Sequence, residues 1–161
     1  MTEPELLPKA VRKVAEDAQA RGVEIAIVKT DKSARSAQEA AEAVGADVGQ
    51  IVKTLVFQGK QSGKALIVMM AGDGRVDEKA VAQLIGEKIR RPDADFVRET
   101  TGFAIGGVSP FGSNHPLRYL MDESLFRFET VWAAAGTPHH VFPIAPDVLC
   151  NATGAEKAAV S

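Results

Sequence analysis

Residues 50–70 read QIVKTLVFQGKQSGKALIVMM and carry the strongest strand pattern of the chain. Two runs rich in apolar and β-branched residues, 50–58 and 64–70, are separated by a short loop that contains Gly59 and Gly63. Their length and composition predict a β-hairpin in a mainly antiparallel sheet. This hairpin is the centre from which the rest of the chain can be placed.

Helices and further strands are predicted on both sides of the hairpin. Apolar spacing and capping residues predict helices over residues 4–21, 36–45, 77–85, 93–100 and 146–154. Short apolar runs predict strands over residues 23–29, 117–121, 130–134 and 140–144, and residues 155–161 are expected to form a frayed tail. Strands in pairs interrupted by single helices favour an α+β fold, with residues 1–161 as one domain.

Composition narrows the class of protein. The 161 residues include 45% hydrophobic and 25% charged residues, which is typical of a globular domain. The formal net charge of −2 argues against a long nucleic-acid interface and allows only a short contact with one or two phosphates. A single cysteine, Cys150, and the acidic N-terminus favour the cytoplasm, and no apolar run is long enough to span a membrane.

Lys53 is the one charge inside the apolar run 51–56. In a strand its side chain shares a face with Ile51 and Leu55, where an unpaired ammonium is costly. Two interpretations are equally supported by the sequence: a lysine that extends to solvent from a sheet edge, and a contact with a substrate phosphate.

Residues 102–110, GFAIGGVSP, form the most unusual stretch. Gly106 and Gly107 allow a ligand to approach the backbone, so successive N–H groups can bind an oxyanion. Pro110 favours an extended Ser109. A tight turn between a helix and a strand is the alternative, and for two glycines alone it is the more common one.

The remaining polar candidates are weaker. His139 and His140 point to opposite faces of a strand, so they cannot both bind one metal, and either a surface position or a pocket role for one of them is open. Asp122 most simply caps a short helix. Because no serine or cysteine has a nucleophile's surroundings, covalent catalysis has no candidate, and no glycine fingerprint for dinucleotides or triphosphates follows a strand.

Four segments together resemble the YbaK/EbsC-like family, which includes the editing domain associated with prolyl-tRNA synthetase. They are Val52-Lys53-Thr54-Leu55, Gly106-Gly107-Val108-Ser109-Pro110, Asp122-Glu123-Ser124 and residues 136–142. The likeness runs from about Gly22 to about Gly154. It implies a curved, largely antiparallel but mixed sheet flanked by helices, and a deacylase that acts in trans on a mischarged tRNA.

The resemblance also implies roles for individual residues. Lys53 would contact the terminal phosphate or ribose, and the loop from Gly106 through Gly107 and Ser109 to Pro110 would hold the aminoacyl carbonyl. His140 would line the amino-acid pocket, and substrate binding would fall to Thr54, Asp122, Gly136 and His139. No cofactor or metal is expected; the expected partners are the aminoacylated acceptor end, with a small amino acid on tRNA(Pro), and prolyl-tRNA synthetase.

The account requires the Lys53 ammonium and the main-chain amides of the glycine loop to meet at one cavity sized for an acylated ribose. Two other hypotheses compete with it. A non-catalytic module could hold tRNA ends or a small anion, since the sequence offers no general base. A zinc hydrolase could use His115, His139 and His140, although their spacing does not favour it.

Overall fold

The predicted helices and most predicted strands are present in a computed structural model, which describes residues 7–161. Within this range the α-helices are α1 (Lys9–Ala20), α2 (Ala37–Val44), α3 (Glu78–Ile85), α4 (Ala94–Thr101) and α5 (Pro146–Thr153). Two 3₁₀ turns are η2 (Val48–Gln50) and η3 (Glu123–Arg127). The first residues of the helix predicted from Pro4 lie outside the described range.

The hairpin at the centre of the sequence is confirmed. β2 (Val52–Gly59) pairs antiparallel with β3 (Ala65–Ala71), in a register that places Lys53 opposite Met70. β3 is followed in the same sheet by β5 (Arg118–Asp122) and β8 (Glu156–Ala158), both in parallel pairing. With β4 (Ile89–Arg90) at its far edge, the sheet has the order β4-β2-β3-β5-β8 and is therefore mixed, within the predicted α+β class.

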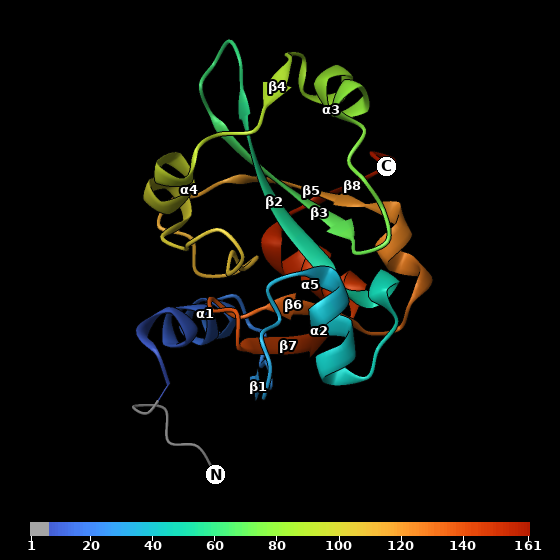
Figure 1. Cartoon of the computed structure of the whole chain (residues 1–161). Helices are drawn as coiled ribbons and strands as arrows, with labels where there is room; N and C mark the ends of the chain where they lie inside the picture. The colour runs from blue at the N-terminus through green and yellow to red at the C-terminus, as the bar shows by residue number, and fades with distance from the viewer. Residues whose placement is uncertain (1–6) are drawn as a thin grey trace.

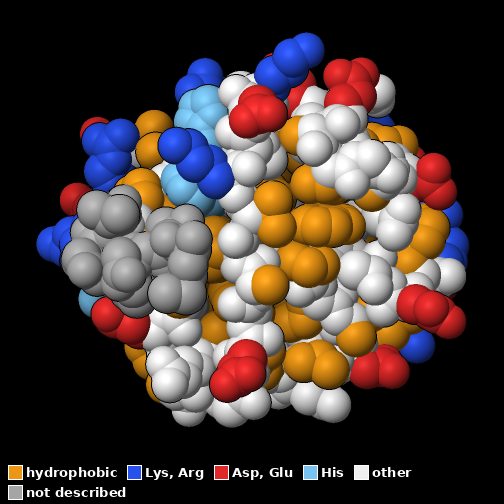
Figure 2. Space-filling view, turned by 90° about the horizontal axis from the view of Figure 1, so that it is seen from below, with side chains coloured by type: hydrophobic (Ala, Val, Ile, Leu, Met, Phe, Trp, Pro, Cys, Tyr) orange, Lys and Arg blue, Asp and Glu red, His pale blue; other side chains and the backbone are white. Residues whose placement is uncertain are grey.

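A second, antiparallel sheet lies beside the first. It contains β1 (Val28–Lys29), β7 (His140–Ile144) and β6 (Val131–Ala134), in the order β1-β7-β6. One bridge, between Ile51 and Trp132, links the two sheets. The small sheet and α2 lie at the bottom of Figure 1, and hydrophobic side chains gather across the middle of the face seen from that side (Figure 2).

The large sheet is buried on both faces because its side chains alternate between two clusters. Met69 and Met121 face the larger cluster, which reaches α1, α5 and the small sheet. Phe57, Val68 and Leu120 face the other cluster, beneath α3. The β2–β3 hairpin therefore forms the rigid centre of the domain, and groups placed on β2 are held firmly.

β2 has an open edge along much of its length. β4 pairs with it only at Gln58 and Gly59, on the side opposite β3. Among the described residues, no strand pairs with that edge over residues 52–57. Main-chain polar groups on such an edge are available to other partners.

Two predictions from the sequence are wrong. The strand expected over residues 23–29 is reduced to Val28 and Lys29, because β7 offers only Val141 and His140 as partners there. The expected frayed tail, residues 155–161, instead contributes β8, and Val160 is 1% exposed. The Val160 N–H donates to Asp122 Oδ1 at 2.9 Å, so a long-range pairing that local composition does not reveal orders the tail.

Within the described part of the chain, no helix has the length and apolar character needed to cross a bilayer.

Candidate active site

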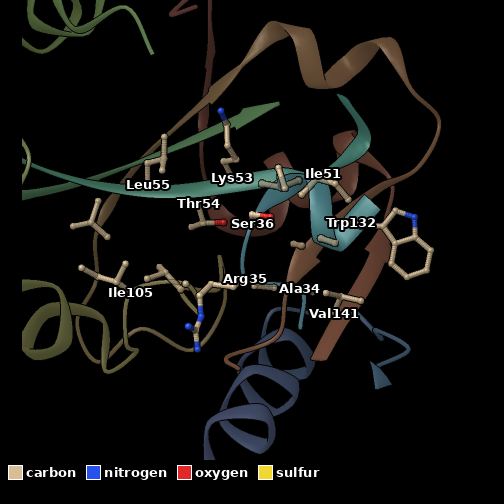
Figure 3. A pocket seen from close by; sticks show the side chains of 18 of the residues that line it. Ala34, Arg35, Ser36, Ile51, Lys53, Thr54, Leu55, Ile105, Trp132 and Val141 are labelled. Atoms are coloured by element: carbon tan, nitrogen blue, oxygen red, sulfur yellow. The ribbon is translucent and has the colours of Figure 1, made fainter. Parts of the chain in front are cut away.

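A cavity of about 550 Å³ runs along the open edge of β2 (Figure 3). Its walls come from β2, the loop around Gly106, residues 34–37 before and within α2, and the small sheet. Most of the lining side chains are apolar, and the polar and charged ones are Arg35, Ser36, Lys53, Thr54 and Arg91. The volume is within the usual range for a small-molecule or nucleoside site.

Thr54 supplies an unused polar group to this cavity. Its Oγ1 atom is buried and has no hydrogen-bond partner among the described residues. Figure 3 shows Thr54 on the cavity side of β2, near Ser36. Because a buried hydroxyl without a partner is unfavourable by about 1–3 kcal/mol, the site is prepared to bond a polar ligand atom at this position.

Lys53 lies at the cavity, but its ammonium points out of it. Figure 3 shows the side chain directed away from Arg35 and Ile105, and the Nζ atom donates a hydrogen bond to the carbonyl oxygen of Gly74. Partial burial lowers the pKa of Lys53 below its usual value, and the positive charges of Arg75 and Arg91 act in the same direction. Lys53 and Gly106 therefore line the same cavity, whereas the expected meeting of the Lys53 ammonium with the glycine loop is not seen.

The glycine loop reaches the cavity through a tight turn. The N–H of Gly107 donates to the carbonyl of Ala104 at 3.0 Å, and Gly106 has a φ of +93° that favours glycine. A Cβ atom on Gly106 would lie 2.9 Å from Cγ of Arg35, so the arginine side chain packs directly over the glycine. The tight-turn interpretation and the position at the cavity are therefore both correct.

Only part of this loop can offer main-chain donors. The Gly107 N–H is already used in the turn, whereas those of Gly106 and Val108 donate no hydrogen bond within residues 7–161. Ser109 is fully buried, and its hydroxyl oxygen accepts a hydrogen bond from the N–H of Phe111 at 3.3 Å. Gly107, Ser109 and Pro110 do not line the cavity.

The two histidines hold a turn together outside the cavity lining. His140 is 6% exposed, and its Nδ1 lies 2.7 Å from Oγ1 of Thr137. Burial, followed by the charges of Lys29 and His139, lowers the pKa of His140 below its usual value. The exposed His139 contributes its carbonyl, which accepts from the N–H of Thr30 at 2.8 Å. Neither ring lines the cavity.

Gly136, in the same turn, serves packing. Its φ is +100°, and a Cβ atom there would lie 2.9 Å from the carbonyl oxygen of Ala10. On its other side, the Gly136 carbonyl would lie 3.0 Å from a Cβ atom on Gly107. The glycine loop and the histidine turn therefore touch through main-chain atoms, although only the loop lines the cavity.

Asp122 is also structural. It is fully buried, caps η3 by accepting from the N–H of Ser124, and accepts from Val160 as well. This confirms the interpretation as a helix cap, and Asp122 does not line the cavity.

His115 lines a separate hollow beside the hairpin loop, and no group of three His, Cys, Asp or Glu in residues 7–161 could hold a metal ion.

Sequence reasoning missed several residues of the cavity: Arg35, Arg91, Ile105 and Trp132. Arg35 immediately precedes the capping residue Ser36, and Arg91 follows a strand of only two residues. The available sequence signal was Ile105, an isoleucine placed directly before two glycines; in the structure its exposed fraction is 64%.

Comparison with known proteins identifies the family. The family model for the aminoacyl-tRNA editing domain matches residues 31–151. The chain belongs to the aminoacyl-tRNA editing family. The resemblance noted in the sequence is thereby confirmed, and the protein is an enzyme of the hydrolase class. Every residue that lines the cavity lies within the matched range, whereas α1 and β8 lie outside it.

Individual relatives of this chain support the same family assignment. YwhH of Bacillus subtilis, which is uncharacterised, is 34% identical over 76% of this chain and 78% of its own length. EbsC of Enterococcus faecalis, a candidate Cys-tRNA(Pro)/Cys-tRNA(Cys) deacylase, is 27% identical over 78% of this chain and 77% of its own. A crystal structure of a candidate trans-editing enzyme for prolyl-tRNA synthetase superimposes with a TM-score of 0.90, at 43% identity, over 96% of this chain and 98% of the other.

Proposed function

We propose that the protein acts in trans to hydrolyse the ester of a mischarged tRNA, with the 3′ adenosine and its amino acid in the cavity beside β2. The observation that carries the proposal is the Thr54 hydroxyl, which finds no hydrogen-bond partner in the described chain and lies in a cavity bordered by the open β2 edge and the Gly106 turn. The net charge of −2 supports recognition of a short acceptor end.

The chemistry follows from an ester that is already reactive. A water oxygen attacks the ester carbonyl, and the N–H groups of Gly106 and Val108 are available to stabilise the oxyanion. The bond from the carbonyl carbon to the ribose oxygen then breaks, releasing the amino acid and a free ribose hydroxyl. Since no carboxylate or imidazole of residues 7–161 lines the cavity, the neighbouring ribose hydroxyl is proposed to take the proton of the water and pass it to the leaving oxygen.

For the amino acid we propose a small residue on tRNA(Pro), with cysteine tested first and alanine and serine next. The names of EbsC and of the similar trans-editing structure support this choice. A cavity of about 550 Å³ must hold the terminal nucleoside as well, so only part of it is left for the amino acid. One methylene changes binding by about 1–3 kcal/mol, so wall residues such as Ile51 and Val141 would set the preference.

The test is a panel of tRNAs charged with cysteine, alanine, serine or proline, incubated with the purified full chain. We expect faster release than in buffer for at least one small amino acid, and little release of proline. Lys53→Ala should reduce kcat/KM about 10- to 100-fold, the loss expected for one hydrogen bond from an ammonium to a substrate phosphate. The fold should stay intact, since the ammonium bonds only Gly74 among the described residues. Release no faster than buffer for every charged tRNA would contradict the proposal.

A second candidate is a non-catalytic module that binds the acceptor end. The part of the chain that the structure describes places no imidazole or carboxylate in the cavity lining to act as a general base, and this observation favours the binding module. Binding of uncharged acceptor RNA without turnover on any member of the panel would select this candidate.

We propose action in the cytoplasm beside prolyl-tRNA synthetase, and co-purification with that enzyme would test the partnership.

A further inference from the structure

The Gly106 turn belongs to a long segment without regular secondary structure. Residues 102–117, between α4 and β5, contain no helix or strand. Such long irregular segments are uncommon in compact domains, so this one depends on neighbouring elements for its conformation. Phe103 and Phe111 anchor it on either side of the turn, since both side chains are buried in the larger core cluster. The polar anchors come from α1.

One side of α1 faces this segment with charged side chains. Lys13, Asp17 and Arg21 recur every four residues, a spacing that brings helical side chains together. Figure 1 shows α1 lying against the loop between α4 and β5. The Asp17 Oδ2 atom accepts a hydrogen bond from the N–H of Gly112 at 2.7 Å. Arg21 pairs with the same carboxylate at 3.1 Å and also donates to the carbonyl of Ala152 in α5, so the carboxylate is held in place.

Lys13 joins the two ends of the segment. Its Nζ atom donates to the carbonyl of Thr101, the last residue of α4, at 3.4 Å. The same atom donates to the side-chain oxygen of Asn114. It also lies 5.1 Å from the centre of the Phe103 ring, within the range of a cation–π contact. Because one ammonium contacts residues on both sides of the Gly106 turn, it closes the loop at its base.

The main chain of the segment rests directly on α1. Gly112 has a φ of +89°, and a Cβ atom there would lie 3.2 Å from the main-chain nitrogen of Val14. Gly136, whose carbonyl lies against Gly107, packs on the carbonyl of Ala10 in the same way. α1 therefore supports both the glycine loop and the histidine turn, although none of its residues lines the cavity.

We infer that Asp17 and Lys13 are positioning residues for the proposed reaction. They hold the glycine loop so that the N–H groups of Gly106 and Val108 face the ester carbonyl. Neither side chain lines the cavity, so each acts through the loop. A displacement of about 1 Å near the reacting atoms can lower a rate about 100-fold, which makes such support important. The inference rests on the proposed function, and it extends the site to a helix outside the range matched by the family model.

The first experiment measures the loop by hydrogen exchange of main-chain amides in the full chain. Asp17→Ala removes the acceptor of the Gly112 N–H, whose exchange should become about 10- to 100-fold faster, as expected for loss of a charged acceptor. The N–H of Gly107, which is bonded within the turn, should also exchange faster because the loop is released. Faster exchange at Gly112 with Gly107 unchanged would overturn the inference.

Asp77→Ala is the matched control. The Asp77 carboxylate also accepts from main-chain N–H groups, two of them at 3.1 Å at the start of α3, and it does not line the cavity. Its removal should speed exchange in α3 and leave Gly107 as in the wild type. Equal acceleration at Gly107 in both variants would show a general loss of stability and would overturn the inference.

The second experiment measures kcat and KM on a mischarged tRNA, at a temperature where each protein assayed is folded. Donors to an oxyanion act in the transition state, so a displaced loop should lower kcat about 10- to 100-fold in Asp17→Ala and leave KM nearly unchanged. Asp17→Asn keeps an oxygen that can accept from Gly112 and should recover most of kcat. Asp77→Ala should keep the wild-type kcat. Lys13→Met is assayed in the same way if Asp17→Ala does not fold.

The outcomes separate the two proposals. A wild-type kcat in the α1 variant, or an equal loss of kcat in Asp77→Ala, would overturn the inference while the proposed function stands. If the wild type releases no amino acid from any charged tRNA, the proposed function fails instead. The exchange rate at Gly107 would then still decide whether α1 holds the loop.

Discussion

The β2 wall of the cavity and the Asp122 region each contain a buried polar group, and the two groups differ in whether the fold supplies a hydrogen-bond partner. Among residues 7–161 the Thr54 hydroxyl has no hydrogen-bond partner, whereas the Asp122 carboxylate accepts from Ser124 and Val160. Both residues lie on or at the end of strands of the same sheet. Of these two residues, the one whose hydroxyl is left unsatisfied lines the cavity, and the one whose carboxylate is satisfied holds the fold together.

The largest expected effect is on the Gly106 turn. Gly106→Val forces a side chain into a φ of +93° and against Arg35, which displaces the N–H groups available to an oxyanion. Removal of one such donor lowers rates about 100- to 1000-fold, so we expect kcat/KM for the mischarged tRNA to fall in that range.

The control for Gly106 is Gly86→Val. Gly86 ends α3 with a φ of +85°, and a Cβ atom there would meet no atom within 4 Å. The backbone strain is similar, but the residue lies outside the cavity lining. A loss of activity as large in Gly86→Val as in Gly106→Val would show that strain, rather than the site, accounts for the effect.

Asp122→Asn should act on stability. The amide replaces a carboxylate oxygen that accepts a hydrogen bond, which is worth about 1.5–3 kcal/mol for charged acceptors. We expect the free energy of unfolding, measured by urea denaturation, to fall by about that amount. At temperatures where the variant remains folded, kcat/KM should match the wild type; a selective loss of activity at full stability would return Asp122 to the site.

Thr54→Val should lower activity and leave stability unchanged. No hydrogen bond within the described residues is lost, so urea denaturation should give an unchanged or slightly higher free energy of unfolding. A lost bond to substrate of about 0.5–1.5 kcal/mol should lower kcat/KM about 2- to 10-fold. Thr153→Val is the control, because the Thr153 hydroxyl donates to Leu149 at 2.8 Å in α5 and should affect only stability.

Much of the fold and part of the cavity could be predicted from the sequence, because these features depend on local sequence patterns. The length and β-branched composition of the two runs predicted the hairpin, and the capping box from Ser36 to Glu39 predicted the start of α2. The cavity positions of Lys53 and Gly106 followed from their unusual neighbours. What the sequence could not show is long-range: β8 pairs with β5, and the Lys53 ammonium turns to a carbonyl 21 residues away.

The smallest expected effect is a pH dependence from His140. Burial lowers its pKa, so the unfolded chain binds the proton more readily than the folded one. Stability from this residue is complete above the unfolded pKa of about 6.5 and declines as the pH falls below it. His140→Asn should flatten the fall in unfolding free energy between pH 7.5 and 5.5. Equal curves for both proteins would show that His140 does not contribute.

Nuclear magnetic resonance can show whether the substrate binds in the cavity between β2 and the Gly106 turn. The ligand is a non-hydrolysable, amide-linked aminoacyl adenosine, and the amide signals of the full chain are followed during its titration. The account predicts that the largest shifts occur at Thr54, Gly106 and Val108. Shifts centred on Asp122, Gly136 and His139, with Thr54 and Gly106 unmoved, would contradict it.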